Sequence, residues 1–311
     1  MQTNAVVLHD PGKLSIESLV LDDPTAADAV VAVRWSGIST GTERLLWTGR
    51  MPPFPGMGYP LVPGYESVGE IVEAGADSGV RVGQTVFVPG ARCFGPVRGL
   101  FGGAASHLVS AGGRLVPIDD ALGERGTLIA LAATARHALA GIDLQRPLLI
   151  VGHGVLGRLV ARIAGALGGS PKVWETNPVR RSSGDAYLVV APDGDARRDY
   201  ATILDVSGDR AILDTAIARL AQGGEIVLAG FYEGRLEFDF APAFLREARI
   251  RVAAQWRPED LTATLALIAA DRLSLDGLVT HRRPAADAPH AYRTAFGEPE
   301  CLKMILDWRA A

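Results

Sequence analysis

The sequence predicts an α/β protein with two domains, one rich in β-strands and one built on a doubly wound parallel sheet. Three observations support this prediction: a length of 311 residues, a change of pattern near residue 121, and a glycine-rich motif between a strand and a helix. A chain of this length usually exceeds one hydrophobic core. We expect residues 1–120, completed by 256–311, to form one domain and residues 121–255 the other.

The first 120 residues contain short alternating or apolar runs that Gly and Pro interrupt. These runs are AVVL, AVVAVRW, ESVGEIVEAG, QTVFVPG and SHLVSA. Alternation with a period of two, bounded by turn residues, is typical of strands. This part of the chain is therefore expected to be a β-domain.

From residue 121 the pattern changes to alternating helices and buried strands. ERGTLIALAATARHALAGI has apolar residues at helical spacing, and PLLIVG reads as a buried strand. Further strands are expected at 172–174, 187–190, 202–206 and 225–229, with a sixth at 250–254. RAILDTAIARLAQGG and DLTATLALIAADRL are expected to be helical. Such alternation predicts a parallel sheet.

The composition excludes several classes of partner. The chain is 48% hydrophobic and 21% charged, with a formal net charge of −4 and no cluster of basic residues. We therefore expect no nucleic-acid partner. No segment approaches 18 unbroken apolar residues, and the first residues lack the pattern of a signal peptide. We expect a cytoplasmic protein without integral membrane contact.

A dinucleotide site is predicted directly after the PLLIV strand. Residues Gly152, His153, Gly154, Val155, Leu156 and Gly157 form a GxGxxG motif that opens a helix. The glycines allow a tight turn and close approach of a pyrophosphate to free N–H groups. Two interpretations of His153 stay open, a pyrophosphate contact and an exposed variable position.

The preference between NAD and NADP is predicted from the end of the next strand. Glu175 follows Gly152 by 23 residues, and a carboxylate there binds ribose hydroxyls and repels a 2′-phosphate. We therefore expect NAD, bound by the motif together with Glu175, Thr176 and Asn177. Arg180 and Arg181 could bind a 2′-phosphate instead, or lie on the surface.

These features, with PGYESVGEIVEAG, RVGQTVFV, LAATARHAL and THRRPAADAPHAYRTAF, resemble the medium-chain dehydrogenase/reductase superfamily. The resemblance implies a GroES-like β-barrel catalytic domain and a Rossmann nucleotide-binding domain. Zinc-dependent members have a Cys, a His and a third ligand where this chain has Ser39, Tyr65, and Ala132 or Ala133. Hydroxyl groups are poor zinc ligands compared with thiolate and imidazole. We expect no metal.

A closer resemblance is to the zinc-free dehydrogenases of bacteriochlorophyll synthesis. It rests on SGISTGTERLLWTGRMPPFPGMGYPLVPGYE, VWETNP and GGEIVLAGFYEGRLEFDF. It implies oxidation of the C3 1-hydroxyethyl group of 3-deacetyl-3-(1-hydroxyethyl)bacteriochlorophyllide a to acetyl, which gives bacteriochlorophyllide a. It also adds two expectations: a homodimer, and peripheral association with pigment-synthesising membranes.

An apolar segment is the candidate site for this tetrapyrrole. Trp47, Phe54 and Tyr59 would contact the macrocycle, and Arg44 or Arg50 would bind a propionate. The alternative is a Pro-rich loop that packs its aromatic residues on its own domain or on a partner subunit.

Without zinc, a side chain must remove the hydroxyl proton of the alcohol. Tyr65 is the leading candidate, with its pKa lowered by a cation such as Arg44. Ser39, Thr42 and Glu66 are further candidates because they occupy or adjoin the replaced ligand positions. His137 and His107 are others, because histidine titrates near neutrality.

Two other functions are kept open. One is a zinc-free quinone or enoyl reductase, which would favour NADPH and which Glu175 argues against. The other is a non-catalytic NAD-sensing or pigment-binding protein.

Overall fold

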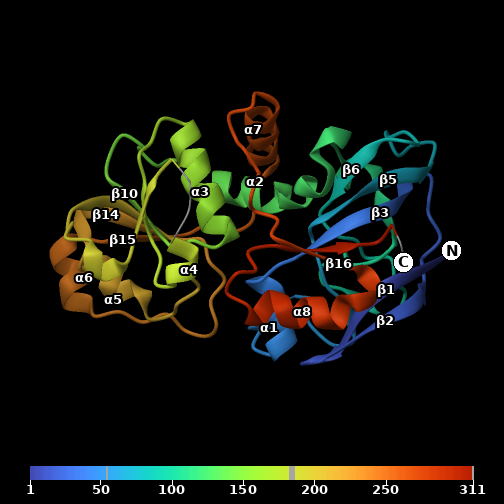
Figure 1. Ribbon diagram of the computed structural model, residues 1–311, viewed down its shortest axis with the longest axis horizontal. Helices are drawn as coiled ribbons and strands as arrows, with labels where there is room; N and C mark the ends of the chain where they lie inside the picture. Colours follow the sequence, from blue (N-terminus) through green and yellow to red (C-terminus); the bar gives the residue numbers. More distant parts are fainter. Residues whose placement is uncertain (54, 182–185, 310–311) are drawn as a thin grey trace. The chain divides into compact units, whose positions relative to one another are not determined.

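The computed structural model describes residues 1–53, 55–181 and 186–309, and the chain divides into two units (Figure 1). Unit 1 comprises Met1–Ala130 and Asp276–Ala311, and unit 2 comprises Leu131–Leu275. The predicted α/β class is confirmed. The unit boundaries differ from the predicted ones, because residues 121–130 lie in unit 1 and residues 256–275 in unit 2.

Specific contacts explain both shifts of boundary. Arg125 donates to Asp276 over 2.7 Å, which ties the 121–130 segment to unit 1. Asp260 binds His137 over 2.7 Å, and Arg162 donates to the Ser274 carbonyl over 3.1 Å, so the 256–275 segment packs with unit 2. The helical spacing of this segment predicts a helix but does not identify the domain on which it packs.

Unit 1 contains a seven-stranded and a four-stranded sheet. The larger has the order β16-β17-β3-β5-β6-β9, with β8 also paired to β3, and the smaller has the order β2-β1-β4-β7. The strands are β1 (Gln2–Asp10), β2 (Lys13–Val20), β3 (Asp28–Ile38), β4 (Leu61–Val62), β5 (Ser67–Ala74), β6 (Thr85–Val88), β7 (Arg98–Gly99), β8 (His107–Ala111), β9 (Val116–Pro117), β16 (His281–Pro284) and β17 (Met304–Asp307).

The end of β3 is where the candidate site forms. β17 runs antiparallel to β3 and pairs Met304 with Ile38, which brings residues near the C-terminus beside Ser39. Helix α1 (Thr42–Thr48) follows β3 and ends at Gly49, whose φ of 69° is the left-handed conformation common after helices. Helix α8 (Ala288–Gly297) contacts α1 through the rings of Tyr292 and Trp47, whose centroids are 6.1 Å apart.

Unit 2 is built on a six-stranded sheet with the order β12-β11-β10-β13-β14-β15, and all neighbouring strands are parallel. Its strands are β10 (Leu148–Val151), β11 (Lys172–Trp174), β12 (Leu188–Val190), β13 (Tyr200–Asp205), β14 (Leu220–Leu228) and β15 (Arg249–Val252). Helix α2 (Ile129–Ala138) crosses from unit 1 into unit 2, and the other helices of unit 2 are α3 (Val155–Ala166), α4 (Pro178–Arg181), α5 (Ile212–Ile217), α6 (Phe240–Arg246) and α7 (Pro258–Ala269). Figure 1 shows α5 and α6 beside β14.

The predicted parallel sheet is therefore confirmed, including its sixth strand. The helix expected over 210–224 is wrong at its end, because α5 stops at Ile217 and Leu220 already pairs with Tyr200 of β13. The apolar spacing continues into the strand, so the pattern alone does not mark this boundary. No helix of the described residues is long and apolar enough to cross a membrane.

Candidate functional site

The glycine-rich motif forms the turn between β10 and α3 in unit 2. Gly152 has a φ of +102°, which favours glycine, and a Cβ on Gly157 would lie 1.9 Å from the Gly152 carbonyl oxygen. A Cβ on Gly154 would meet no atom within 4 Å. Gly152 and Gly157 are therefore required by the turn itself, whereas Gly154 borders open space.

His153 is fully buried, so the interpretation as an exposed position is wrong. Its Nδ1 lies 2.7 Å from the Arg180 carbonyl oxygen and its Nε2 lies 2.9 Å from the Tyr187 hydroxyl. Because both ring nitrogens have protein partners, the side chain stabilises the loop around the motif. Val155 is also buried, and Leu156 is partly exposed.

Glu175 follows β11 directly and is oriented by two peptide groups. The His153 N–H donates to Oε2 over 3.1 Å and the Asn177 N–H donates to Oε1 over 2.7 Å. Thr176 is exposed, and Asn177 accepts from the Val179 N–H at the start of α4. The structure thus brings the acidic side chain to the glycine-rich turn, as the motif predicts.

These residues fit a dinucleotide. The open space at Gly154 lies at the N-terminus of α3, where free N–H groups and the helix dipole favour a phosphate. Each carboxylate oxygen of Glu175 keeps lone pairs beyond its one backbone bond, so it can still accept from ribose hydroxyls. All of these residues belong to unit 2.

A second cluster lies in unit 1 and joins Ser39 and Tyr65, two of the positions that the resemblance aligns with zinc ligands. The Ser39 and Tyr65 hydroxyls lie 2.7 Å apart, and the Thr42 side chain also hydrogen-bonds Tyr65. Ser39 follows β3 and Tyr65 precedes β5, so strand pairing brings the two hydroxyls together. Of the predicted catalytic residues, the structure therefore unites Ser39, Thr42 and Tyr65.

Two buried carboxylates accompany these hydroxyls. Glu43 accepts from the Ser39 N–H over 2.9 Å and from the Tyr292 hydroxyl over 2.5 Å. Glu66 accepts from Lys303 over 2.5 Å, and Lys303 also donates to the Ile38 carbonyl over 3.1 Å. In the described part of the chain, Glu66 Oε1 has no hydrogen-bond partner. Burial raises the pKa of Glu66, and Lys303 opposes this shift.

The expected lowering of the Tyr65 pKa is wrong. Burial and the neighbouring Glu66 carboxylate raise the pKa of this phenol above its ordinary value. Arg44 is exposed on α1 and is not among the groups that shift this pKa. A phenol in this environment stays protonated near neutrality.

His137 belongs to unit 2 and is not part of the hydroxyl cluster. Its Nδ1 lies 2.7 Å from the Asp260 carboxylate, which joins α2 to α7. This contact gives the partly buried imidazole a structural partner.

The residues predicted to bind a tetrapyrrole lie on or near α1. Trp47 packs on Tyr292 and Phe296, and the Tyr59 hydroxyl donates to the Leu46 carbonyl over 2.6 Å. Arg44 and Arg50 are exposed, and Phe54 lies outside the described residues. The packing of Trp47 and Tyr59 agrees with the alternative in which the segment covers its own domain.

Sequence reasoning missed Tyr292 and Lys303. Both are almost fully buried, and they come from near the C-terminus, more than 200 residues from their partners. The single available signal was the lysine inside the apolar run CLKMIL, because a buried lysine requires a partner.

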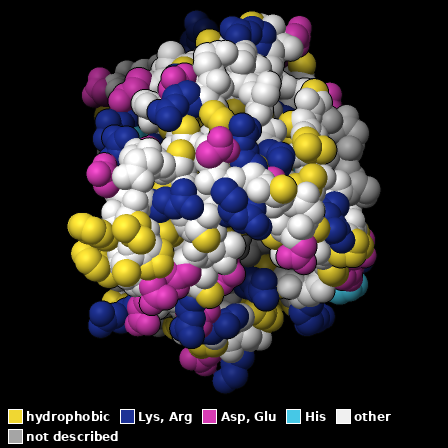
Figure 2. Space-filling view, turned by 90° about the vertical axis from the view of Figure 1, so that its left-hand side faces the viewer, with side chains coloured by type: hydrophobic (Ala, Val, Ile, Leu, Met, Phe, Trp, Pro, Cys, Tyr) yellow, Lys and Arg dark blue, Asp and Glu magenta, His cyan; other side chains and the backbone are white. Residues whose placement is uncertain are grey.

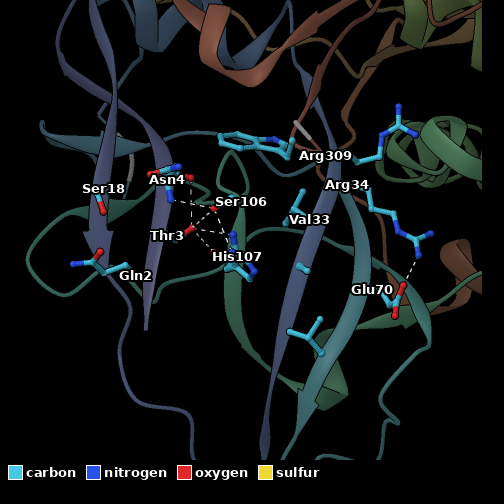
Figure 3. Close-up of a pocket in the computed structure, with 13 residues that line it drawn as sticks. Gln2, Thr3, Asn4, Ser18, Val33, Arg34, Glu70, Ser106, His107 and Arg309 are labelled. Carbon is cyan, nitrogen blue, oxygen red and sulfur yellow. Dashed lines mark hydrogen bonds and ion pairs between the residues drawn. The ribbon is translucent and has the colours of Figure 1, made fainter. Parts of the chain in front are cut away.

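Of the predicted candidates, His107 lines a cavity of about 600 Å³ in unit 1 (Figure 3). Thr3 contacts Ser106 over 3.2 Å and donates to the His107 carbonyl over 3.0 Å, and Arg34 pairs with Glu70. These polar groups bind one another, so none of them is aimed at a ligand.

Within residues 1–53, 55–181 and 186–309, no three His, Cys, Asp or Glu side chains are grouped so that they could hold a metal ion. The donors at the replaced ligand positions are hydroxyls, which bind zinc poorly.

Comparison with known proteins defines the class. Residues 25–120 match the alcohol dehydrogenase GroES-like domain family. The L-idonate 5-dehydrogenase structure from Escherichia coli superposes with a TM-score of 0.87 at 20% identity, covering 99% of each chain, which shows the shared fold. A GroES-like domain with a parallel Rossmann sheet is the architecture of medium-chain dehydrogenases.

Two relatives identify the family within this class. The chain is 58% identical to the 2-desacetyl-2-hydroxyethyl bacteriochlorophyllide A dehydrogenase of Rhodobacter capsulatus, covering 100% of both chains. It is 57% identical to the protein of the same name from Cereibacter sphaeroides, covering 100% of this chain and 99% of that one. The chain therefore belongs to this dehydrogenase family of the medium-chain dehydrogenase/reductase superfamily.

Proposed function

We propose that the chain oxidises the hydroxyethyl substituent of a bacteriochlorophyllide to acetyl, with NAD as the hydride acceptor. The observation that carries this proposal is the full-length identity of 58% and 57% to two dehydrogenases named for such a substrate. The predicted substrate numbers the substituent position 3 and the relatives' name numbers it 2; both describe hydroxyethyl in place of acetyl.

The reaction breaks the C–H and O–H bonds of the secondary alcohol and forms a C=O bond. When bound, the nicotinamide supplies the acceptor for the hydride that leaves carbon. The chain must bind and orient the reactants and take the hydroxyl proton. The turn at Gly152–Gly157 and the carboxylate of Glu175 support the choice of NAD, because a buried negative charge disfavours a 2′-phosphate.

The hydroxyls of Ser39, Tyr65 and Thr42 are the groups that we propose for the proton. Each can donate and accept at once, so the Ser39–Tyr65 pair can accept the alcohol proton while the partly exposed Thr42 hydroxyl, bonded to Tyr65, releases another to solvent. Because the Tyr65 pKa is raised, we assign the phenol to a relay and not to a tyrosinate base. The ion pair with Lys303 holds the Glu66 carboxylate in place next to Tyr65.

Exposed cations of the α1 region are proposed to bind the pigment's propionate. Arg44 and Arg50 are both exposed, and a guanidinium binds a carboxylate in bidentate fashion. Packing of Trp47 and Tyr59 on unit 1 would then hold the segment that carries these cations.

An absorbance assay tests the proposed function. Purified chain, NAD⁺ and the 1-hydroxyethyl pigment are expected to shift the long-wavelength band to the red, because an acetyl carbonyl extends the conjugation of the macrocycle. Tyr65→Phe keeps the aromatic ring and should lower kcat/KM by about 10²- to 10⁴-fold, the contribution of a positioned acid–base group. NAD binding without any shift would contradict the pigment substrate and favour another substrate or a sensing role.

We also propose a homodimer, formed through a surface that we call the α6 face. This surface comprises Phe240, Phe244 and Leu245 of α6 with Ile250 and Val252 of β15. Phe240 is 73% and Val252 75% exposed. Figure 2 shows apolar side chains gathered in a patch with acidic and basic side chains around it.

A second copy is the occupant that this face fits. β15 is the last strand of the sheet among the described residues, and an exposed strand edge pairs with another strand. Arg249 begins β15 and Asp239 caps α6, and both are exposed, so a two-fold contact can join each charge to its opposite. Light scattering should show a dimer that Val252→Asp converts to a monomer. Val82→Asp, at a valine of unit 1 that is 63% exposed, should leave the dimer unchanged; a wild-type monomer would contradict the proposal.

A further inference from the structure

Glu43 is a buried acid that the proposed proton relay does not use directly. It is 1% exposed and lies in the first turn of α1. Both carboxylate oxygens accept hydrogen bonds from neutral donors, the Ser39 peptide N–H and the Tyr292 hydroxyl. An acidic side chain buried this deeply requires an explanation.

The two contacts connect α8 to the hydroxyl cluster. Tyr292 lies on α8, packs on Trp47 and donates to Glu43 over 2.5 Å. Glu43 in turn accepts from Ser39, whose side chain bonds the Tyr65 hydroxyl. The carboxylate thus fixes the backbone from which the Ser39 hydroxyl extends.

We propose that Glu43, oriented by Tyr292, is a positioning residue that holds the Ser39–Tyr65 hydroxyl pair in its working geometry when its carboxyl group is ionised. This inference rests on the proposed alcohol oxidation. An ionised acceptor makes hydrogen bonds about twice as strong as a neutral one. Protonation of Glu43 weakens both of its bonds and loosens Ser39, so turnover falls on the acid side.

The groups around Glu43 bring the pKa of its carboxyl group close to neutral pH. Burial raises the pKa of Glu43 to about 7, with the Glu66 charge adding to the rise. The hydrogen bonds from Tyr292 and Ser39 and the charge of Lys303 oppose it. These groups come from α8, from the end of β3, and from the segments next to β5 and β17, and the Tyr65 phenol completes the cluster.

The direction in which each substitution changes the pH profile of kcat follows from these contacts. The Tyr292 hydroxyl lowers the Glu43 pKa, so Tyr292→Phe is expected to move the acid limb of the kcat profile to higher pH. Glu43→Gln keeps an acceptor for Ser39 but cannot ionise, so that limb should disappear. Glu73→Gln, at an exposed carboxylate of β5, is the matched control and should keep the wild-type profile.

The experiment combines kcat profiles with infrared difference spectra of the pigment-free protein across neutral pH. We expect wild-type kcat to fall about tenfold per pH unit below the Glu43 pKa. The carboxyl band that titrates in the same range should be absent from Glu43→Gln. An identical profile in wild type and Glu43→Gln, with both folded by their melting curves, would overturn the proposal. If Glu43→Gln fails to fold, Tyr292→Phe decides the test: an acid limb of its kcat profile that does not move would also overturn the proposal. Carboxyl titration without any turnover would instead contradict the proposed function.

Discussion

Glu175 is the residue on which the proposed preference for NAD rests. Two peptide N–H groups fix its carboxylate at the turn that Gly152 opens. In the proposed binding mode, this acidic side chain would accept from the ribose hydroxyls of NAD and disfavour the 2′-phosphate of NADP.

We predict that Glu175→Gln reduces the preference for NAD⁺ over NADP⁺. The amide keeps the size of the side chain but removes its charge, so the ratio of the two Kd values should fall by about 10- to 100-fold, or about 1.4–2.8 kcal/mol. Fluorescence titration with each dinucleotide measures this ratio. Glu259→Gln, at an exposed glutamate of unit 2, serves as the control. An unchanged ratio would show that Glu175 does not select the cofactor.

Individual residues also show how much of the candidate site could be predicted from the sequence. Ser39, Tyr65 and Glu175 could be found because each occupies a defined position of a local motif. Tyr292 and Lys303 could not, because their roles depend on the antiparallel pairing of β17 with β3 and on the packing of α8 against α1. The raised Tyr65 pKa likewise depends on burial, which a sequence does not reveal.

Among the elements, the turn from β10 to α3 offers two glycines with opposite expected behaviour. A methyl group on Gly157 would collide with the Gly152 carbonyl, whereas one on Gly154 enters open space. Gly154 also has a φ of −74°, which alanine adopts without strain.

We predict that Gly154→Ala keeps the melting temperature but weakens NAD binding, because its methyl group occupies the space proposed for the pyrophosphate. Gly157→Ala should lower the melting temperature as well, since β10 and α3 must separate. Calorimetric melting and NAD titration separate these effects. Tight NAD binding by Gly154→Ala would place the cofactor away from this turn.

Asp195 is the polar centre of the β11–β13 region. Its carboxylate accepts from Lys172 and Trp174 over 2.8 Å and from Tyr200 over 2.6 Å. Burial raises its pKa, but these hydrogen bonds outweigh burial and bring the pKa below its ordinary value. Its stabilising effect is therefore complete above the unfolded pKa and is lost as pH falls through the folded pKa.

We predict that Asp195→Asn destabilises unit 2 by about 2–4 kcal/mol at neutral pH, because Lys172 loses its charged partner and the amide cannot accept all three bonds. The difference from wild type should shrink in acid. Urea unfolding at several pH values measures it. Asp199→Asn, at the exposed partner of Arg197, should have a small effect; equal losses in the two variants would contradict this account.

Element by element, regular patterns were the most informative. The strand at 172–174 and the sixth strand were predictable because buried parallel strands are short apolar runs between helices. The end of α5 was not, because the apolar residues of a helix and of the following strand join without a break.

For the whole molecule, the two-domain organisation was predictable and its boundaries were not. The 256–275 segment has the pattern of an amphipathic helix, but the His137–Asp260 contact determines the unit on which it packs. Long-range contacts of this kind depend on the folded chain.

The most direct test of the central claim is turnover of the 1-hydroxyethyl pigment with NAD⁺ after exhaustive chelation, with the metal content measured in the same sample. If the Ser39–Tyr65 hydroxyls take the place of a metal, the acetyl product should form at the untreated rate in metal-free protein. A rate that chelation abolishes and added Zn²⁺ restores would contradict the account.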